Sequence, residues 1–600
     1  MRTRPSETSR ILSLPLRGAH PGNARARLES LLSARPQVVQ PHDKGWPGTA
    51  HAGKRERCDC SDGSCQHLLT VQAEALTEAL VQSRVHPDRL VVGRIGVGGG
   101  KTLISLLLPS ILPCKRPVLL VPAKLRSKTL RAMPEIKRHW RVRSDILLHS
   151  YEEVSVNPEL LDELGADLVI GDEAHRLARL QAGRTRRVLR VAKRRPEIRW
   201  VWLSGTFDKR SPKDSAHLVE LALRDGSYLP IDENELKSWH NVLGSRGVPE
   251  ATDWGMFRPI VDAWGERPER WDESASARLQ LCREALDKRV RATPGVVTLQ
   301  TMSCDASVIL RRVHRDCPQE IRSAIREMTD TGLIPGSSGA AALGDVEVTR
   351  ASETLAMGFF YRWAWERTRK GEPDKDWMGA RSFYSSELSD YLVIGGQGER
   401  DGVDTPGHVA RIAESDPGRL PHGLVAAYQG WCLVRDRYRI AYLDDHPGGG
   451  EEVIPVEPVW LTADVVGWMV DELETPGTIV WYHHRAVARA LQGLGARVFL
   501  RGQEPPNDGV SCCLSEHSHG EGHDLESFGR MVIPCPTPSG SHVEQLIGRI
   551  HRPGQQRDEV EVDLWTHVDR LDESVDRALV DARYLHYSGT LQRLIVGTWE

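Results

Sequence analysis

The hydrophobic positions of the chain fall into blocks that predict an α/β region near its start. Residues 68–82 have the spacing of an amphipathic helix, and glycines interrupt the apolar run 90–112, which indicates a strand, a loop and a helix. Further apolar runs of strand length follow at 116–123, 145–150, 166–175 and 198–207. Short apolar strands that alternate with helices predict a parallel sheet covered on both faces.

The pattern changes after residue 211 and returns to α/β character near residue 456. Between these points, long segments have helical spacing, many tryptophans and few strand signals. Strand-length apolar runs then recur at 477–484, 496–502, 511–517 and 529–536. We therefore predict an α/β protein with two parallel-sheet lobes, at 69–225 and 456–600, and an inserted, mainly helical domain at 226–455.

Composition limits the classes of protein that fit this pattern. A chain of 600 residues, 40% of them hydrophobic and 27% charged, is long enough for several globular domains. The formal net charge of -3 gives no overall attraction to nucleic acid, so a polyanion site would have to be local. We find no apolar run that could cross a bilayer and no signal-peptide core at the start, and therefore expect a cytoplasmic protein.

Two features precede the first predicted lobe. Residues 1–57 carry an excess of Lys and Arg with scattered Pro and Gly, which predicts a flexible basic arm. The element 58–68 contains a C-x-C-x₄-C-x-H array formed by Cys58, Cys60, Cys65 and His67. Three thiolates and an imidazole are a ligand set for structural Zn²⁺, and a reduced loop without metal is the alternative.

A glycine-rich loop, "RIGVGGGKT", joins the first predicted strand to its helix. Glycines at such a loop let backbone N–H groups approach a phosphate chain, and the following helix presents its positive end. Lys101 would reach the β and γ phosphates and Thr102 would place its hydroxyl on Mg²⁺. The strict loop pattern has glycine where this chain has Ile95, so an ordinary glycine turn stays open on this motif alone. The predicted loop glycines are Gly98, Gly99 and Gly100.

An acidic pair, Asp172 and Glu173, follows the apolar strand "DLVIG". A carboxylate at the end of a parallel strand lies beside the loop of its neighbour, where Mg²⁺ needs a ligand, and Asp172 has that position. Glu173 would then act as the general base for an attacking water. The alternative is the solvated start of a helix, where acidic residues are common.

A third motif, "QLIGRIHRPGQQ", places Gln545, Arg549 and Arg552 at spacings of four and three. In a helix these spacings bring all three side chains to one face. Guanidinium groups supplied from a second lobe suit the charge that develops on a transferred phosphate. An exposed basic helix is the alternative.

Together these motifs resemble those of the SWI/SNF-type ATPases of helicase superfamily two. The superfamily form A-x-x-G-x-G-K-T accommodates the glycine loop, and "DEAH" at 172–175 is the matching box. Segments "VLLVPAKL", "LLHSYEEVS" and "WLSGTF" are similar to motifs Ia, Ib and III, and "GTIVWYHH", "GEGHDLESF" and "EQLIGRIHRPGQQ" to motifs IV, V and VI. The resemblance covers 69–225 and 456–600, and the rhythm of the helical middle, including "LAMGFFYRWAW", resembles that of compact phage and prophage members.

This resemblance implies two RecA-like lobes that clamp ATP and Mg²⁺ between them and move along duplex DNA. It assigns adenine recognition to Gln72, while Asp524 departs from the asparagine usual in motif V. It assigns the coupling of hydrolysis to lobe movement to His175, Ser204, Gly205 and Thr206. It assigns nucleic-acid contacts to Lys124, Arg126, Lys128 and Gly522. The cysteine array is similar to a SWIM-type zinc finger with a shortened spacer.

Two further sets of residues have alternative interpretations. The basic residues of 184–195 are a solvated helix face or a phosphate-binding stripe. Tryptophans of the middle region can stack on bases or pack in a core; they include Trp239, Trp254, Trp363 and Trp365.

We predict an ATP hydrolase that acts as a DNA translocase or helicase, with ATP, Mg²⁺ and structural Zn²⁺ as cofactors and DNA as partner. Two alternatives stay open. One is a slow nucleotide-regulated switch that binds DNA or a protein. The other is the motor subunit of a nuclease or defence complex, in which a partner protein would cut.

Overall fold

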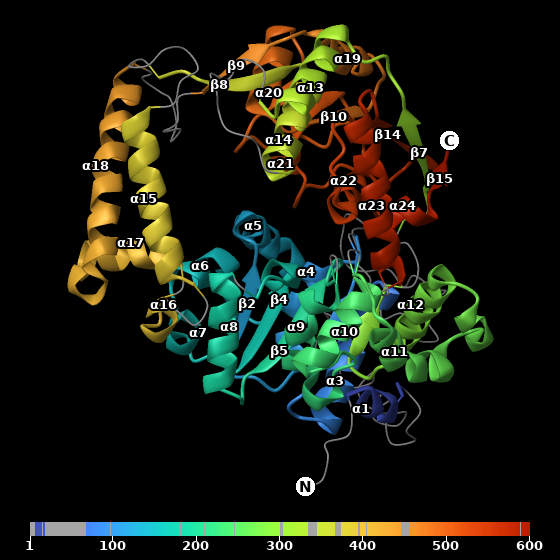
Figure 1. The fold of residues 1–600 in the computed structure, drawn as a ribbon. Coiled ribbons are helices and arrows are strands. Elements are labelled where there is room, and N and C mark those ends of the chain that lie inside the picture. Colours follow the sequence, from blue (N-terminus) through green and yellow to red (C-terminus); the bar gives the residue numbers. More distant parts are fainter. Residues whose placement is uncertain are drawn as a thin grey trace.

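The computed structural model contains two α/β bodies and a projecting helical arm (Figure 1). It describes residues 7–14, 16, 17, 68–96, 98–180, 182–208, 211–244, 247–299, 304–333, 345–365, 374–393, 397–403, 405–445, 456–587 and 590–600. The predicted zinc ligands Cys58, Cys60, Cys65 and His67 lie outside these residues, as does most of the predicted basic arm. No helix in the described part of the chain has the length and apolar character needed to span a membrane.

The first body, lobe 1, is built on a six-stranded sheet of order β3-β2-β4-β5-β1-β6. Every neighbouring pair of strands is parallel, as the sequence predicts. The strands are β1 (Val92–Arg94), β2 (Pro117–Val121), β3 (Leu147–Ser150), β4 (Leu168–Asp172), β5 (Arg199–Ser204) and β6 (Val296–Thr298). Its helices are α1 (Glu7–Ser13), α3 (Thr70–Val85), α4 (Lys101–Ile111), α5 (Ala123–His139), α6 (Tyr151–Val156), α7 (Leu160–Glu163), α8 (Gly183–Arg194), α9 (Ala216–Leu223), α10 (Glu233–Leu243), α11 (Ala251–Trp264) and α12 (Ala275–Arg291).

The second body, lobe 2, is built on a seven-stranded parallel sheet of order β11-β12-β10-β13-β14-β7-β15. Its strands are β7 (Ser307–Val313), β10 (Thr478–Tyr482), β11 (Val498–Phe499), β12 (Cys512–Ser515), β13 (Arg530–Ile533), β14 (Glu559–Trp565) and β15 (Thr598–Trp599). Its helices are α13 (Gln319–Thr331), α14 (Asp345–Ala356), α19 (Asp464–Glu472), α20 (Arg485–Gly493), α21 (Glu516–His519), α22 (Gly540–Ile550), α23 (Asp569–Tyr587) and α24 (Arg593–Val596).

Both faces of the lobe 1 sheet are buried, which explains its near-continuous apolar strands. In β5, Trp200 and Trp202 belong to one hydrophobic cluster, while Val201 and Leu203 belong to another. Successive side chains of a strand point to opposite faces, so the two clusters are the cores above and below the sheet. The predicted α/β class with parallel sheets is confirmed.

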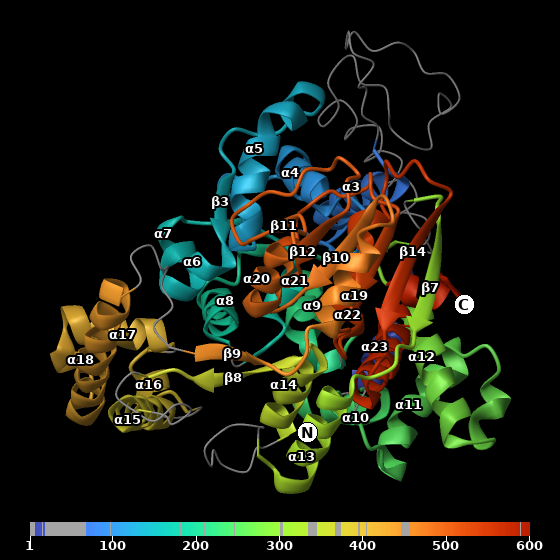
Figure 2. The same cartoon turned by 90° about the horizontal axis from the view of Figure 1, so that it is seen from above.

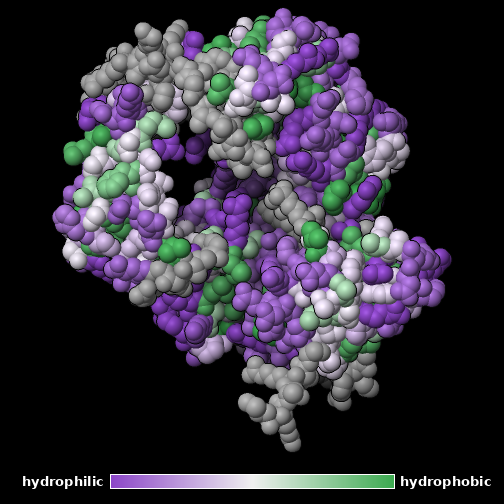
Figure 3. All heavy atoms as spheres, in the orientation of Figure 1, coloured by the Kyte–Doolittle hydropathy of each residue, from purple (hydrophilic) through white to green (hydrophobic). Residues whose placement is uncertain are grey.

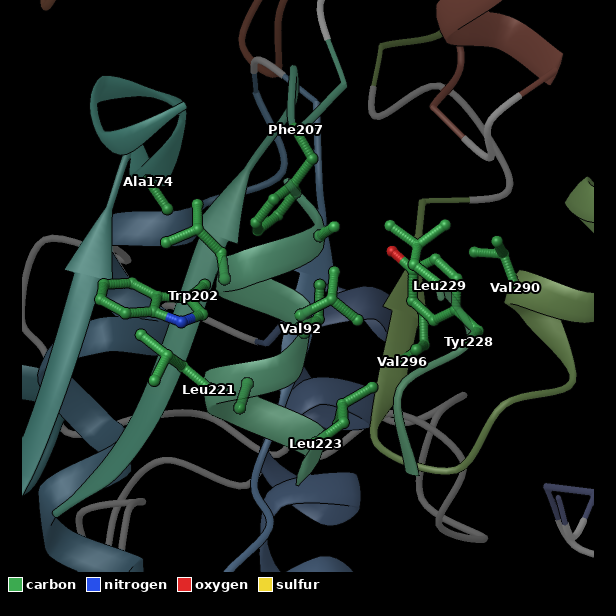
Figure 4. Packing of buried hydrophobic residues seen from close by; sticks show 14 of the residues in the cluster. Val92, Ala174, Trp202, Phe207, Leu221, Leu223, Tyr228, Leu229, Val290 and Val296 are labelled. Atoms are coloured by element: carbon green, nitrogen blue, oxygen red, sulfur yellow. The ribbon is translucent and has the colours of Figure 1, made fainter. Parts of the chain in front are cut away.

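The predicted helical domain at 226–455 is divided in the structure. Val290 and Val296 pack with Val92 and Trp202 in one core, so α9 to α12 cover a face of the lobe 1 sheet (Figure 4). Strand β6 extends that sheet, whereas β7 pairs with β14 and β15 of lobe 2. Lobe 1 therefore extends to Thr298 and lobe 2 begins at Ser307, instead of at residues 225 and 456. The separate helical part is the arm at 374–445.

The start of the chain also differs from the prediction of a flexible arm at 1–57. Residues 7–13 form α1, which packs on lobe 1 and buries Ile11 completely. The backbone N–H of Glu7 donates to Glu235 at 2.9 Å, and Arg10 donates to the carbonyl of Leu229 at 2.9 Å. The helix is stable because it docks, since seven residues are too few for a stable isolated helix.

The arm is a helical hairpin that stands on a two-stranded antiparallel ribbon extending from lobe 2 (Figures 1 and 2). The ribbon is β8 (Phe359–Trp363) with β9 (Val456–Trp460), and the helices are α15 (Lys375–Tyr391), α16 (Gln397–Arg400), α17 (Pro406–Ser415) and α18 (His422–Asp445). Trp363 stacks on Trp365, which lies 5.3 Å from Trp377 between ring centroids. Trp239 is fully buried. In this structure these tryptophans pack against protein rather than offer faces to bases.

Candidate active site between the lobes

A cleft of about 320 Å³ lies where the two lobes meet, and it gathers residues that are far apart in the sequence. Lobe 1 contributes the glycine loop and the end of β4, and lobe 2 contributes α22 and the turn after it. The predicted residues that line this cleft are Gly98, Gly100, Lys101, Thr102, Lys128, Asp172, Glu173, His175, Gly522, Gln545, Arg549 and Arg552.

The glycine loop needs its glycines for conformation and for space. Gly98 and Gly100 have φ of 88° and 69°, in the left-handed region that favours glycine. A Cβ at Gly100 would lie 1.9 Å from Nε2 of Gln72, and one at Gly99 would lie 2.3 Å from Cγ2 of Ile95. Gly100 is also the N-cap of α4, so the loop delivers the chain into a helix whose positive end faces the cleft.

Gln72 lies beneath this loop rather than in the cleft wall. Its side-chain oxygen accepts from the backbone N–H of Leu69 at 2.8 Å, which caps α3. Its amide nitrogen faces Gly100. Recognition of adenine by Gln72 therefore stays a prediction.

The loop and the end of β4 bring a lysine, a hydroxyl and two carboxylates together. Lys101 is buried, and its Nζ lies 3.1 Å from Oε1 of Glu173. Thr102 Oγ1 donates to Oδ2 of Asp172 at 2.9 Å. The phenol of Tyr151 donates to the carbonyl of Asp172 at 2.9 Å and fixes the strand end.

The two carboxylates have opposite pKa shifts. Burial and the neighbouring Glu173 raise the pKa of Asp172 to about 6. Burial acts to raise the pKa of Glu173 as well, but Lys101 and His175 outweigh it and hold this pKa well below its ordinary value. Glu173 is therefore ionised at neutral pH, as a general base must be.

Asp172 and Thr102 fit a Mg²⁺ ion bound with a nucleotide. Both present oxygen ligands at one spot, and Asp172 is 1% exposed. Mg²⁺ is usually held by one or two protein oxygens, with phosphates and waters completing the octahedron. The described residues include no group of three or more His, Cys, Asp or Glu side chains that could hold a metal ion.

Glu173 adopts a backbone conformation that is rare for a residue with a side chain. Its φ of 55° lies in the left-handed region, and such strained residues concentrate at functional sites. The next residues form a 3₁₀ turn, Ala174–Leu177, that returns His175 toward the carboxylate. His175 Nδ1 lies 3.3 Å from Oε2 of Glu173 and 3.1 Å from Oγ of Ser204.

The contact between His175 and Ser204 connects the acidic pair to the end of β5. Ser204 Oγ accepts from the backbone N–H of Thr206 at 3.1 Å. Thr206 and Gly205 line a small gap that Glu173 and Gln545 also line, so the β5 turn faces lobe 2 across this gap. A Cβ at Gly205 would lie 2.9 Å from the Cα of Gly96. The predicted coupling residues therefore form a connected series that runs from Glu173 through His175 and Ser204 to the turn at Thr206, which faces lobe 2.

The predicted single helix face for Gln545, Arg549 and Arg552 is corrected by the structure. Helix α22 ends at Ile550, and Arg552 lies in the turn that follows. The reason is Pro553, because a residue before proline is disfavoured in helical conformation. The two arginines still converge, since each donates through Nη1 to the carbonyl of His523 at 3.2 Å.

Arg549 is the more buried of the two arginines. It is 8% exposed, and its Nε donates to the carbonyl of Gln545 at 3.1 Å. Burial and the neighbouring Arg552 lower the pKa of Arg549 to about 10, so it remains charged at neutral pH. Arg552 forms an ion pair with Asp524.

Asp524 connects the two lobes at the mouth of the cleft. Its other oxygen lies 3.1 Å from Nζ of Lys128 on α5, and Lys128 also donates to the carbonyl of Gly522. Lys124 donates to the carbonyl of His517. The predicted nucleic-acid residues Lys124 and Lys128 thus contact lobe 2 in this arrangement.

Two other arginines near the cleft, Arg126 and Arg176, differ in the lobe that they contact. Arg126 stays within lobe 1 and donates to the carbonyl of Leu148 at 3.2 Å. Arg176, which directly follows the acidic box, forms an ion pair of 2.6 Å with Glu521 of lobe 2. The sequence analysis missed this pair, because no spacing connects residues 176 and 521.

These contacts define a class of protein: an α/β protein whose two parallel-sheet lobes meet at a polar cleft with a glycine loop on one wall and arginines on the other. No family model matches the chain, and a search of curated proteins finds no match either.

Proposed function

We propose that the protein hydrolyses ATP between two RecA-like lobes and uses the cycle of closure and release to move along duplex DNA. One observation supports this most. Lys101 and Glu173 of lobe 1 and Arg552 of lobe 2 line the same cleft. A nucleotide bound there would contact both lobes, so its hydrolysis would change the energy of holding them together.

The residues of the cleft have complementary roles in this proposal. The loop N–H groups and Lys101 would bind the β and γ phosphates. Thr102 and Asp172 would hold Mg²⁺, which would neutralise phosphate charge. Glu173 takes the proton of the attacking water as the water oxygen bonds to the γ phosphorus and the bond from that phosphorus to its bridging oxygen breaks, which releases ADP. Arg549 and Arg552 stabilise the charge that develops on the transferred group.

Movement along DNA requires that the cleft communicate with a polyanion site. A second hollow of about 650 Å³ adjoins the cleft and shares Lys128 and Asp524 with it. Its basic lining includes Lys124, Arg131 and Arg501. Such side chains bind phosphates without reading sequence. Lys124 and Arg131 now contact His517 and Glu504 of lobe 2, and exchanging these partners for DNA phosphates would connect DNA binding to lobe separation.

ATP turnover measured with and without nucleic acid tests this function. We expect duplex DNA to stimulate turnover, with single-stranded and forked DNA compared at equal nucleotide concentration. Turnover that is the same in the absence of DNA would contradict a translocase. DNA binding with negligible turnover under every condition would favour a nucleotide-regulated switch instead.

Replacing Asp524 with asparagine should strengthen nucleotide binding. Asp524 places a negative charge at the mouth of the cleft and holds Arg552 and Lys128, which a triphosphate would otherwise attract. Removing one charge near the phosphates is worth about 1 kcal/mol or more, which is about fivefold in affinity. Titration with a fluorescent ATP analogue measures the change.

Asp508→Asn is the matched control, because Asp508 makes its ion pair with Arg497 on the lobe 2 surface. We expect no change in affinity there. Weaker binding by Asp524→Asn would mean that this carboxylate contacts the nucleotide, rather than competes with the phosphates for Arg552 and Lys128.

A further inference from the structure

The helical arm connects the two lobes by a second route, separate from the cleft. Its root is the β8–β9 ribbon of lobe 2, and its tip, formed by α16 and α17, lies beside α6, α7 and α8 of lobe 1 (Figure 1). At the tip, Arg187 of α8 donates to Oγ1 of Thr405 at 3.2 Å. Arg411 of α17 donates to the carbonyl of Val156 at the end of α6.

The root of the arm is built as a rigid joint. Trp365 from the ribbon end, Trp377 from α15 and Tyr438 from α18 are in mutual ring contact at centroid distances of 4.8 to 5.6 Å. Trp431 of α18 adds an edge contact with Trp377 at 4.7 Å. Such aromatic packing fixes the helices relative to the ribbon.

The tip, in contrast, can separate from lobe 1 at low cost. Val156 is 56% exposed and Arg411 is also exposed, so their contact is surrounded by water. Arg187 is 1% exposed, but it also donates to the carbonyl of Val154 at 2.9 Å within lobe 1. Release of Thr405 therefore leaves Arg187 with a partner in its own lobe. An exposed polar contact of this kind contributes little to stability.

These contacts close a ring. Lobe 1 contacts lobe 2 through pairs such as Arg176 with Glu521, lobe 2 continues into the arm, and the arm tip returns to lobe 1. The space-filling view shows the resulting opening between the arm and the lobes, with many hydrophilic residues around it (Figure 3).

We propose that this ring encloses duplex DNA and that the tip contact at Thr405 and Arg411 is the latch through which DNA enters. The inference rests on the proposed function, which supplies DNA as the polymer. A chain of net charge -3 has no overall attraction to DNA, so its electrostatic affinity rests on local contacts such as those of the basic hollow, and these weaken as salt concentration rises. An enclosed polymer stays bound without such affinity, because it can leave only through an end or through an opened latch.

The full chain, loaded in the presence of ATP, can be tested on bead-bound DNA of one sequence in two forms. One form is a covalently closed circle, and the other is linear with free ends. After a wash at high salt, we expect the half-life on the circle to be at least tenfold longer than on the linear form. Cutting the circle with a restriction enzyme should release the protein at the linear rate.

Latch variants add an independent measurement. Thr405→Ala with Arg411→Ala should bring the half-life on the circle close to the linear value while DNA-free ATP turnover stays unchanged. Arg419→Ala is the control, because Arg419 lies in the same arm but donates to the carbonyl of Asp401 inside it. This control should keep the long half-life.

Equal half-lives of wild-type protein on the two DNA forms, together with DNA-stimulated turnover, would overturn the enclosure and leave the proposed function intact. Absence of binding to either form would overturn both. The comparison of circular with linear DNA uses only wild-type protein, so it tests the enclosure even if a latch variant fails to fold.

Discussion

Replacing Glu173 with glutamine is expected to reduce ATP turnover by about 10²-fold to 10⁴-fold while nucleotide still binds. Glutamine keeps the shape of the side chain and one oxygen that Lys101 can contact. In the wild-type protein, Nζ of Lys101 lies 3.1 Å from Oε1 of Glu173. The glutamine amide cannot accept a proton from water. Because His175 also contacts the Glu173 carboxylate, the substitution weakens the connection to Ser204 as well. Steady-state turnover and a separate measurement of nucleotide affinity distinguish lost chemistry from lost binding.

Glu197→Gln is a suitable control for this substitution. Glu197 is exposed and pairs with Arg195 on the surface of lobe 1, away from the cleft. It should keep full turnover. If Glu173→Gln retained more than about a tenth of the wild-type rate, another group would have to act as the base.

The sequence predicts the lobe 1 sheet well because its strands carry a local signal. The strands that hold the site, such as β4 and β5, are apolar on both faces, and each is followed by polar or glycine residues. Parallel strands end at one edge of a sheet, so the spacing alone places Asp172 near the glycine loop.

Domain boundaries were not predictable in the same way. Strand β6 has three residues, and β7 pairs with β14, whose residues lie far along the chain. Neither strand has a helix-strand repeat around it, because β6 and β7 follow each other directly between α12 of lobe 1 and α13 of lobe 2. Helix α1 is equally difficult to predict from sequence, because its stability comes from docking Ile11 into a core formed by distant residues.

The lobe-to-lobe contacts form the part of the site that sequence could not supply. The pairs of Asp524 with Lys128 and of Arg176 with Glu521 depend on how two separately folded surfaces meet. Sequence indicated Asp524 only as a departure from a family pattern. Similarly, the spacing of Arg552 from Arg549 suggested one helix face, and the proline after Arg552 ends the helix before that residue.

Replacing Arg552 with alanine is expected to lower the maximal rate of ATP turnover by about 10³-fold, with nucleotide affinity changed much less. Arg552 lines the cleft from lobe 2, is 21% exposed at its side chain and is restrained by Asp524, so it can move toward a phosphate when the lobes close. A charge that acts mainly in the transition state changes the rate rather than the binding. Arg549 is buried and bonded to two backbone carbonyls, so Arg549→Ala should lower stability as well as rate.

Thermal unfolding measured beside turnover separates these two arginines. Arg552→Ala should unfold near the wild-type temperature, whereas Arg549→Ala should unfold several degrees lower, since a loss of about 1–3 kcal/mol accompanies orphaned buried acceptors. Arg577→Ala, at an exposed position on α23, should change neither quantity. A full rate for Arg552→Ala would mean that the lobe 2 wall does not take part in hydrolysis, and that lobe closure is not coupled to ATP at this cleft.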